Sequence, residues 1–229
     1  MSRVLVLIDG FNYYHRLDEY QDKYNECVKW LNYRSLIESY LDDKDKENVK
    51  IIYFSAIAKH RPSHSQKRHK TYINALKSQN IDVVLGNFKD KFIIRCKNNE
   101  KCSNCLNTQD KTKLKRHEEK NTDVNIAITL IEYTIMNQYD KCFILSSDSD
   151  FSSAVLRAKQ LAPDKQIIIC PPPYPDKKIR NFKYYIGNLT KISGQDPLFI
   201  YWNKIKANQF PDDFNGLINP WQVTKSVQI

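Results

Sequence analysis

The sequence has no apolar run near the ~20 residues that a membrane-spanning helix needs. The opening VLVLI is too short for a secretory signal and has no cleavage region after it. Only five of the 229 residues are glycine, and no glycine-rich loop leads into Lys-Ser or Lys-Thr, which argues against a nucleotide triphosphatase. Internal repeats and low-complexity tracts are also missing. We therefore expect a soluble, cytoplasmic protein with no membrane partner.

Charge and cysteine content narrow the class further. The chain has 36 Lys and Arg against 26 Asp and Glu, for a net charge of +10 and a pI near 9.2. Such a balance favours a polyanionic partner such as nucleic acid. In the reducing cytoplasm we expect the six cysteines to be buried thiols or metal ligands, and we do not expect a disulfide framework.

Short apolar runs alternate with segments of helical length and period. The runs predict strands over 3–9, 49–57, 81–88, 141–147 and 165–170, and the segments between them predict helices over 33–43, 65–79, 123–138 and 151–162. LTKIS at 189–193 adds the expectation of a last short strand. Strand and helix in repeated alternation predict an α/β domain over residues 1–194 with a central, mainly parallel sheet.

Two segments depart from this alternation. Residues 89–119 form a Lys-rich, cysteine-bearing insertion with little apolar periodicity, so we expect it to need an outside tie to become ordered. Residues 195–229 form an aromatic C-terminal extension that we expect to pack against the body or against a partner chain, which makes an oligomer through this extension a candidate arrangement.

Four aspartates are expected to meet at one edge of the sheet. Asp9 and Asp148 each end a predicted strand, and ligands of such sheets bind outside the carboxyl ends of the strands. Asp123 begins a helix that leads back to the same edge, and Asp150 follows Asp148. Two unit charges ~4 Å apart repel by about 4 kcal/mol at an effective dielectric near 20, so a divalent cation would relieve the cluster. Oxygen ligands suit Mg²⁺ or Mn²⁺. Each acid taken alone also fits a helix cap or a turn.

Other residues near this edge fit roles in substrate binding. Asn12 lies at the start of the first predicted helix, where its amide reaches a phosphate or a metal-bound water, or serves as an N-cap. Tyr13 is a candidate for stacking on a base. The cations that would hold phosphates are Lys59, Arg61, Lys67, Arg68 and Lys120. For any one of these lysines and arginines, a solvated surface position is the alternative.

The segments VLVLIDGFNYY, EEKNTDVNIAITLI and FILSSDSDFSSAV, in this order, resemble the NYN domains of the PIN-like nuclease superfamily, in particular its LabA-like branch. The resemblance covers roughly residues 3 to 192. It implies a three-layer α/β/α fold and a metal-dependent ribonuclease site at Asp9, Asn12, Asp123, Asp148 and Asp150. One position departs from the pattern: Ser147 stands where the last motif usually has glycine, so we expect the local turn to differ.

The cysteine-bearing insertion has the spacing of a structural zinc site. Cys102 and Cys105 form a C-x₂-C pair, and Cys96 and His117 supply two more soft ligands for a tetrahedral Cys₃His centre. LabA-like domains can carry such a knuckle ahead of the EEK motif. The alternative is a lysine-rich loop with free thiols.

These observations predict a metal-dependent nuclease, an endoribonuclease, that hydrolyses RNA phosphodiester bonds with Mg²⁺ or Mn²⁺; DNA is an alternative substrate. The competing hypothesis is an RNA-binding regulatory module with the same fold and no catalysis. A phosphatase of the haloacid dehalogenase type needs Asp-x-Asp at the end of the first strand, and Asp9 is instead followed by Gly10 and Phe11.

Overall fold

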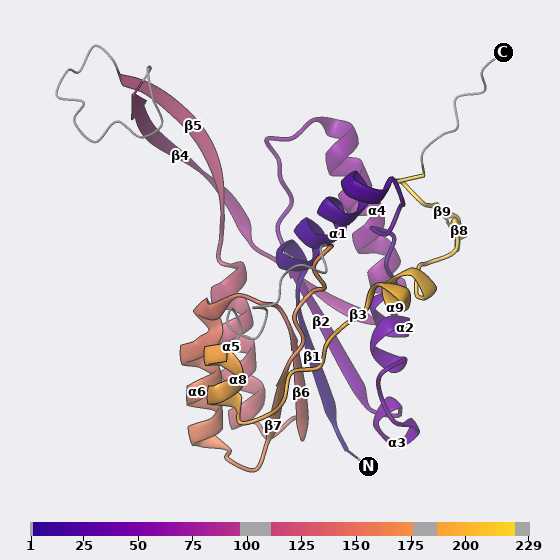
Figure 1. The fold of residues 1–229 in the computed structure, drawn as a ribbon, viewed down its shortest axis with the longest axis vertical. Coiled ribbons are helices and arrows are strands. Elements are labelled where there is room, and N and C mark those ends of the chain that lie inside the picture. Colours follow the sequence, from indigo (N-terminus) through magenta and orange to yellow (C-terminus); the bar gives the residue numbers. More distant parts are fainter. Residues whose placement is uncertain (1, 97–110, 176–186, 223–229) are drawn as a thin grey trace.

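The protein is built on a five-stranded sheet in which every neighbouring pair of strands is parallel. The structure, a computed structural model, describes residues 2–96, 111–175 and 187–222. The strand order is β3-β2-β1-β6-β7 (Figure 1). The strands are β1 (Val4–Asp9), β2 (Val49–Ser55), β3 (Ile81–Leu85), β6 (Lys141–Leu145) and β7 (Gln166–Ile169). The predicted α/β fold with a parallel sheet is confirmed.

Both faces of the sheet are buried, which is why its strands are continuous apolar runs. In β1, Val4, Val6 and Ile8 belong to one hydrophobic core, and Leu5 and Leu7 belong to the other. Because successive side chains of a strand point to opposite faces, each residue of β1 contributes to one core and its neighbour to the other.

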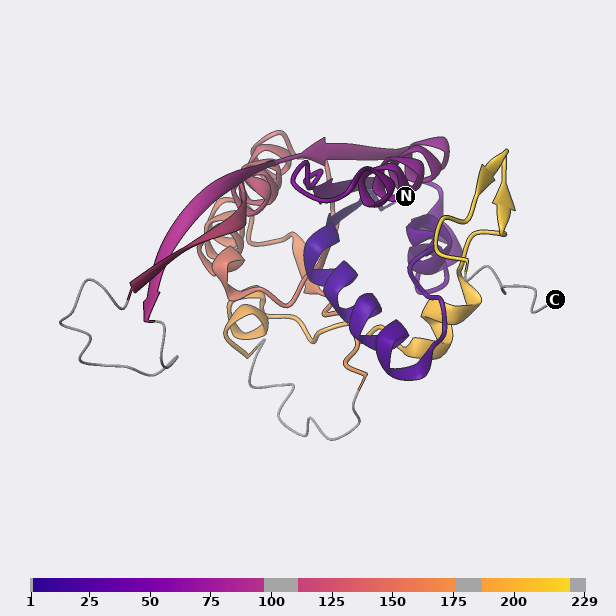
Figure 2. The ribbon, with the colours of Figure 1, turned by 90° about the horizontal axis from the view of Figure 1, so that it is seen from above.

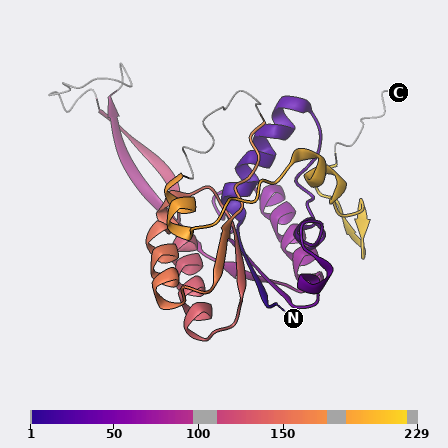
Figure 3. The same ribbon diagram turned by 60° about the horizontal axis from the view of Figure 1, so that its bottom comes forward.

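Helices cover both faces and make the three layers that the resemblance implied. Helices α1 (Gly10–Tyr24), α2 (Tyr33–Glu38) and α4 (Ser63–Ser78) line one core, α5 (Thr122–Ile135), α6 (Ser152–Leu161) and α8 (Gly187–Ser193) line the other, and α3 (Asp43–Lys46) is a short turn before β2. The two layers of helices, one on each side of the sheet, are visible in Figure 3. The predicted strand at 189–193 is wrong, because this segment is helix α8. Among the described helices, none is long and apolar enough to cross a membrane.

An antiparallel ribbon projects from the body (Figures 1 and 2). It consists of β4 (Asn87–Cys96) and β5 (Lys111–Lys120), paired over their full length. Cross-strand ion pairs accompany the ladder: Lys115 lies 2.7 Å from Asp90, and Lys91 lies 3.2 Å from Glu118. The ladder joins the described strands of this insertion, and the outside tie that the sequence led us to expect stays a prediction. Residues 97–110 lie outside the described residues.

The C-terminal extension packs on the same body. It contains α9 (Trp202–Ala207) and a small hairpin of β8 (Asp213–Phe214) and β9 (Leu217–Ile218). The Trp202 ring stacks on Tyr20 at 3.9 Å, and Ile205 and Phe210 are buried in the core beneath α1 and α2. Of the two expectations for this segment, packing against the body is the one that these contacts support. Oligomerisation through it stays a prediction.

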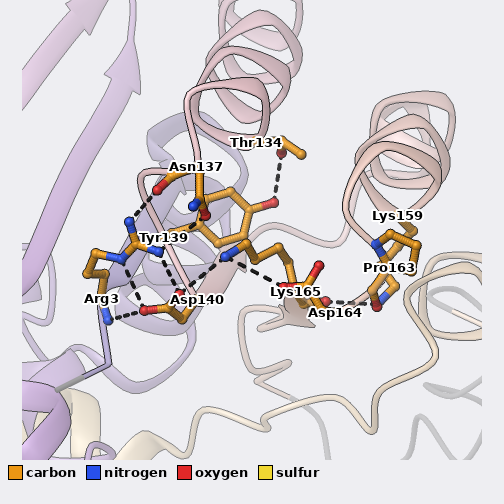
Figure 4. Close-up of polar contacts among 9 residues, drawn as sticks. All are labelled: Arg3, Thr134, Asn137, Tyr139, Asp140, Lys159, Pro163, Asp164 and Lys165. Atoms are coloured by element: carbon orange, nitrogen blue, oxygen red, sulfur yellow. Dashed lines mark hydrogen bonds and ion pairs between the residues drawn. The ribbon is translucent and has the colours of Figure 1, made fainter.

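A polar network ties the amino edge of the sheet, opposite the strand ends that carry the acids. Asp140 accepts hydrogen bonds from the backbone N–H of Arg3 at 2.8 Å and from its guanidinium at 2.7 Å, and Lys165 lies 3.2 Å away (Figure 4). These bonds hold the pKa of Asp140 well below its usual range. The start of β1 is thereby fixed to the turn before β6.

Candidate metal-dependent nuclease site

Two neighbouring strands bring the first acids together. β1 pairs with β6 so that Ile8 lies opposite Leu145. Asp9 is the last residue of β1, and Asp148 follows β6 after Ser146 and Ser147. Because the two strands are parallel, both acids lie at the same carboxyl edge, as the sequence predicted.

Asp9 is the most constrained acid of the site. Its side chain is only 5% exposed, and it accepts hydrogen bonds from the backbone N–H of Asn12 and from the hydroxyl of Ser146, each at 3.0 Å. The first bond caps helix α1. Burial raises the pKa of Asp9 to about 6; the two hydrogen bonds oppose this, and the charges of Asp123 and Asp148 add to it. The site therefore holds a carboxylate that is unfavourable without a counter-charge.

Ser146 and Asn12 fix the turn that carries the next acid. The buried Ser146 hydroxyl donates to Asp9 and accepts from the backbone N–H of Asp148 at 3.1 Å. The amide oxygen of Asn12 accepts from both the backbone N–H and the hydroxyl of Ser147, each at 3.1 Å. Residue 147 is not among the positive-φ positions of the described chain, so serine fits here without backbone strain. Asn12 thus orients the turn through its amide oxygen.

Asp148 and Asp150 form a local cap, and Asp123 approaches them from α5. Asp148 accepts the backbone N–H of Asp150 at 2.9 Å and so begins the short 3₁₀ helix Ser149–Phe151. Partial burial raises the pKa of Asp123, and the charges of Asp148 and Asp150 raise it further. Asp123 therefore interacts electrostatically with the other three predicted acids, and Asp9 also interacts with Asp148.

A fifth carboxylate, Glu119, was not predicted. It lies at the base of β5 and accepts a hydrogen bond from the Thr122 hydroxyl at 2.5 Å. Burial raises its pKa to about 7; the Thr122 bond opposes this, and the charges of Asp9 and Asp123 add to it. The EEK segment belongs to one of the motifs that resemble the family. Which of its two glutamates faces the site depends on residues 111–120 forming a strand, and the sequence did not predict that strand.

A close backbone approach places the start of α5 beside the sheet. A Cβ added to Gly86 would lie 2.6 Å from the Lys120 carbonyl oxygen and 2.7 Å from the Thr122 hydroxyl. The amide of Gly86 also donates to the Ser55 carbonyl at 2.8 Å. A side chain at position 86 would therefore push Glu119 and Asp123 away from Asp9.

The side chains at this edge offer oxygen ligands that suit a hard divalent cation, although their carboxylates are not arranged around one common point. Within the described ranges, no three His, Cys, Asp or Glu side chains are grouped closely enough to hold an ion. Burial and neighbouring carboxylates nevertheless raise the pKa values of Asp9, Glu119 and Asp123, and these side chains offer only oxygen atoms as ligands. A divalent cation would reverse those shifts, which agrees with Mg²⁺ or Mn²⁺ as the ion.

The structure contradicts one of the predicted substrate-binding residues and leaves the others as candidates. The prediction for Tyr13 is wrong: its ring is fully buried and its hydroxyl donates to the Cys170 carbonyl at 2.9 Å, so it cannot stack on a base. Lys120 lies 3.2 Å from Glu118, which points to the ribbon face opposite Glu119. The remaining cations stay candidates: Lys59, Arg61 and Lys67 are exposed and Arg68 is half-buried, around the loop after β2 and the start of α4.

The described residues do not assemble the predicted zinc centre. Cys102 and Cys105 lie outside them. Cys96 pairs with Lys111, while His117 pairs with Asp90, six positions farther along the ribbon, or roughly 20 Å. One tetrahedral ion cannot bind both residues in this register. His117 instead lies 2.8 Å from Asp90 through Nδ1 and stacks on His60. The prediction of His117 as a ligand beside Cys96 is therefore wrong.

Removing the Asp9 charge should stabilise the protein most at neutral pH. The folded-state pKa of about 6 exceeds the ordinary 3.8, so ionising Asp9 costs stability that grows as the pH rises through this interval. The variant Asp9→Asn keeps the helix cap. As the pH rises from about 5 to about 7.5, we expect its free energy of unfolding to increase relative to that of the wild type by on the order of 1 kcal/mol. Urea denaturation in EDTA measures this gain.

The matched control is Asp164→Asn, which removes one charge from a side chain that is 77% exposed. Its stability difference from wild type should be the same at both pH values. A gain for Asp9→Asn that does not change with pH would contradict the raised pKa.

Comparison with known proteins gives one result. The family model described as NYN domain matches residues 3–187, which is most of the chain. Searches of curated proteins and of solved structures gave no significant match. NYN domains are PIN-like and are generally nucleases, in agreement with the parallel sheet and the acidic edge. This chain belongs to the NYN domain family.

Proposed function

We propose that this NYN domain is a metal-dependent ribonuclease whose ion is held by Asp9, Asp123, Asp148 and Asp150. The observation that carries the proposal is the position of the buried Asp9 carboxylate at the same carboxyl edge of the sheet as Asp148; burial raises the pKa of Asp9, and the charges of Asp123 and Asp148 raise it further. A divalent ion at this edge would supply the positive charge that the buried carboxylate lacks. When bound, the ion would activate water and offset charge on the leaving oxygen.

The protein's own residues supply orientation and proton transfer. Ser146 and Asn12 hold Asp9 and the turn bearing Asp148 in fixed positions through the hydrogen bonds described above. Glu119, a further carboxylate at this edge that accepts a hydrogen bond from Thr122, would be the group that accepts or releases a proton. The exposed cations Lys59, Arg61 and Lys67 would hold the phosphates on either side of the cleaved bond.

RNA is the proposed substrate, and an internal cut is the proposed mode. The motifs quoted above for the LabA-like branch support this finer assignment, and the net charge of +10 agrees with a polyanionic substrate.

Cleavage of end-labelled RNA tests the proposal. We expect internal cleavage with Mn²⁺ or Mg²⁺ and at least about a 100-fold slower reaction in EDTA. Filter binding on the same preparation identifies the competing function. Tight, salt-sensitive binding that leaves the RNA intact with either ion would favour a regulatory binding module and overturn the nuclease.

A further inference from the structure

The ribbon has one face that continues outward from the acidic edge. In an antiparallel pair, directly opposite residues share a face, and so do residues two positions apart. Phe88 lies opposite Glu119, and Asp90 lies opposite His117. Burial and the charges of Asp9 and Asp123 raise the pKa of Glu119, so its side chain faces the acidic edge. Phe88 and His117 are therefore on the face that begins at the candidate site.

Rings from four separate segments contact one another along this face. Phe11, in the first turn of α1, lies 5.6 Å from Phe88. His60, in the loop after β2, lies 5.0 Å from Phe88 in an edge-to-face contact. His60 also stacks on His117 with a centroid distance of 3.8 Å and an interplanar angle of 4°. We call Phe11, Phe88, His60 and His117 the ring cluster.

The ring cluster is accessible and lies among cations. His60 and Arg61 are exposed, and the His117 side chain is 26% exposed. Partial desolvation lowers the pKa of His60, and the nearby His117 and Arg61 lower it further. Lys115 also acts on His60 and lies 2.7 Å from Asp90. Flat rings beside positive charge are the surface on which unpaired bases stack.

The other face of the ribbon differs in composition. The pairs Lys89 with Glu118 and Lys91 with Arg116 point to that face, and none of these four side chains is aromatic. Positive charge is thus present on both faces of the ribbon, whereas the rings next to the site lie only on the face that carries Glu119. A purely electrostatic binding surface would not require this asymmetry.

We propose that the ring cluster is a base-binding subsite for unpaired RNA entering the cleavage site, with a base stacked on His60 and phosphates held by Arg61 and Lys115. The inference rests on the proposed RNA substrate. Bases in a duplex are already paired and stacked, so the subsite selects an unpaired strand.

Binding measured in EDTA tests the subsite separately from catalysis. With a labelled single-stranded RNA of about 12 nucleotides, we expect the double variant His60→Ala, His117→Ala to bind at least about 10-fold more weakly than wild type. The double variant His60→Phe, His117→Phe keeps both rings and should bind within about threefold of wild type. Fluorescence anisotropy provides both affinities, and circular dichroism verifies that each variant is folded.

The matched control is Lys91→Ala, Arg116→Ala, which removes two charges from the opposite face of the same ribbon. We expect it to change affinity by less than about threefold at about 150 mM salt. A strand of the same length without bases should bind wild type at least about 10-fold more weakly than RNA, and the His-to-Ala variant should not weaken it further.

Two results would overturn the subsite. One is equal weakening by the His-to-Ala variant and the opposite-face control; the other is equal affinity of wild type for RNA and for the strand without bases. Either would show a surface that attracts phosphates by charge alone. Because no ion is present in this assay, a failure of the proposed nuclease activity would not produce these results.

Discussion

Asp148→Asn is expected to lower the rate of RNA cleavage by about 100-fold or more. The loss follows because the variant keeps the shape of the side chain and its Oδ1 acceptor for Asp150 but removes a charge from the acidic cluster. Changes to residues that only support metal ligands typically cost 10–100-fold, so removing the charge of a ligand should cost at least as much. Single-turnover cleavage of labelled RNA in saturating Mn²⁺ measures the rate.

Asp164→Asn is again the matched control, because it removes the same charge from an exposed side chain at the amino edge of the sheet. It should cleave RNA at the wild-type rate. The half-saturating Mn²⁺ concentration should rise for Asp148→Asn and stay unchanged for Asp164→Asn. If the two variants cleaved equally fast, Asp148 would have no part in the reaction.

Trp30→Ala is expected to destabilise the protein by about 3–5 kcal/mol. The Trp30 ring is 1% exposed and lies 5.2 Å from Phe210, and its Nε1 donates to the Pro211 carbonyl at 2.8 Å. The change leaves a cavity and an unpaired carbonyl. Because domains are stable by only about 5–15 kcal/mol, the loss would remove a large share of the total. Urea denaturation measures it.

Tyr201→Ala is the control for Trp30→Ala, since Tyr201 lies in the C-terminal extension that contacts Trp30 but is itself 60% exposed. It should change stability by less than about 0.5 kcal/mol. If the extension packs on Trp30, the loss in Trp30→Ala, Phe210→Ala should fall short of the sum of the single losses by at least about 0.5 kcal/mol. Additive losses would indicate that the two rings do not support each other.

The sequence predicted the sheet well because its strands are buried on both faces. A run such as VLVLID has no polar position at which a surface strand would face water, and only a covered parallel sheet accommodates it. The position of the acids followed from the same fact, since parallel strands end together. Asp9 and Asp148 lie at one edge for that reason.

The ribbon could not be predicted from apolar pattern, because apolar burial is not what holds it together. Its strands pair through backbone hydrogen bonds and through ion pairs such as Lys115 with Asp90, which join residues 25 positions apart. Local composition does not report such pairing. Glu119 was missed for the same reason, because its face of the ribbon depends on the register.

Helical spacing bears on two other errors, and only the first was readable in the sequence. Tyr13, Leu17 and Tyr20 recur at the spacing of one helix face, and all three are buried, so the helical period assigns Tyr13 to the core. In LTKIS, Leu189 and Ser193 are four residues apart and both are buried in α8, a helical spacing that its single turn of sequence was too short to reveal.

The junction between β5 and α5 determines where this chain tolerates changes in length. Only Asn121, at a φ of 76°, separates Lys120 from Thr122. One inserted residue there would rotate the helix by about 100° and turn Asp123 away from its neighbours. We therefore expect changes in length at this junction to displace Asp123 from the acidic edge.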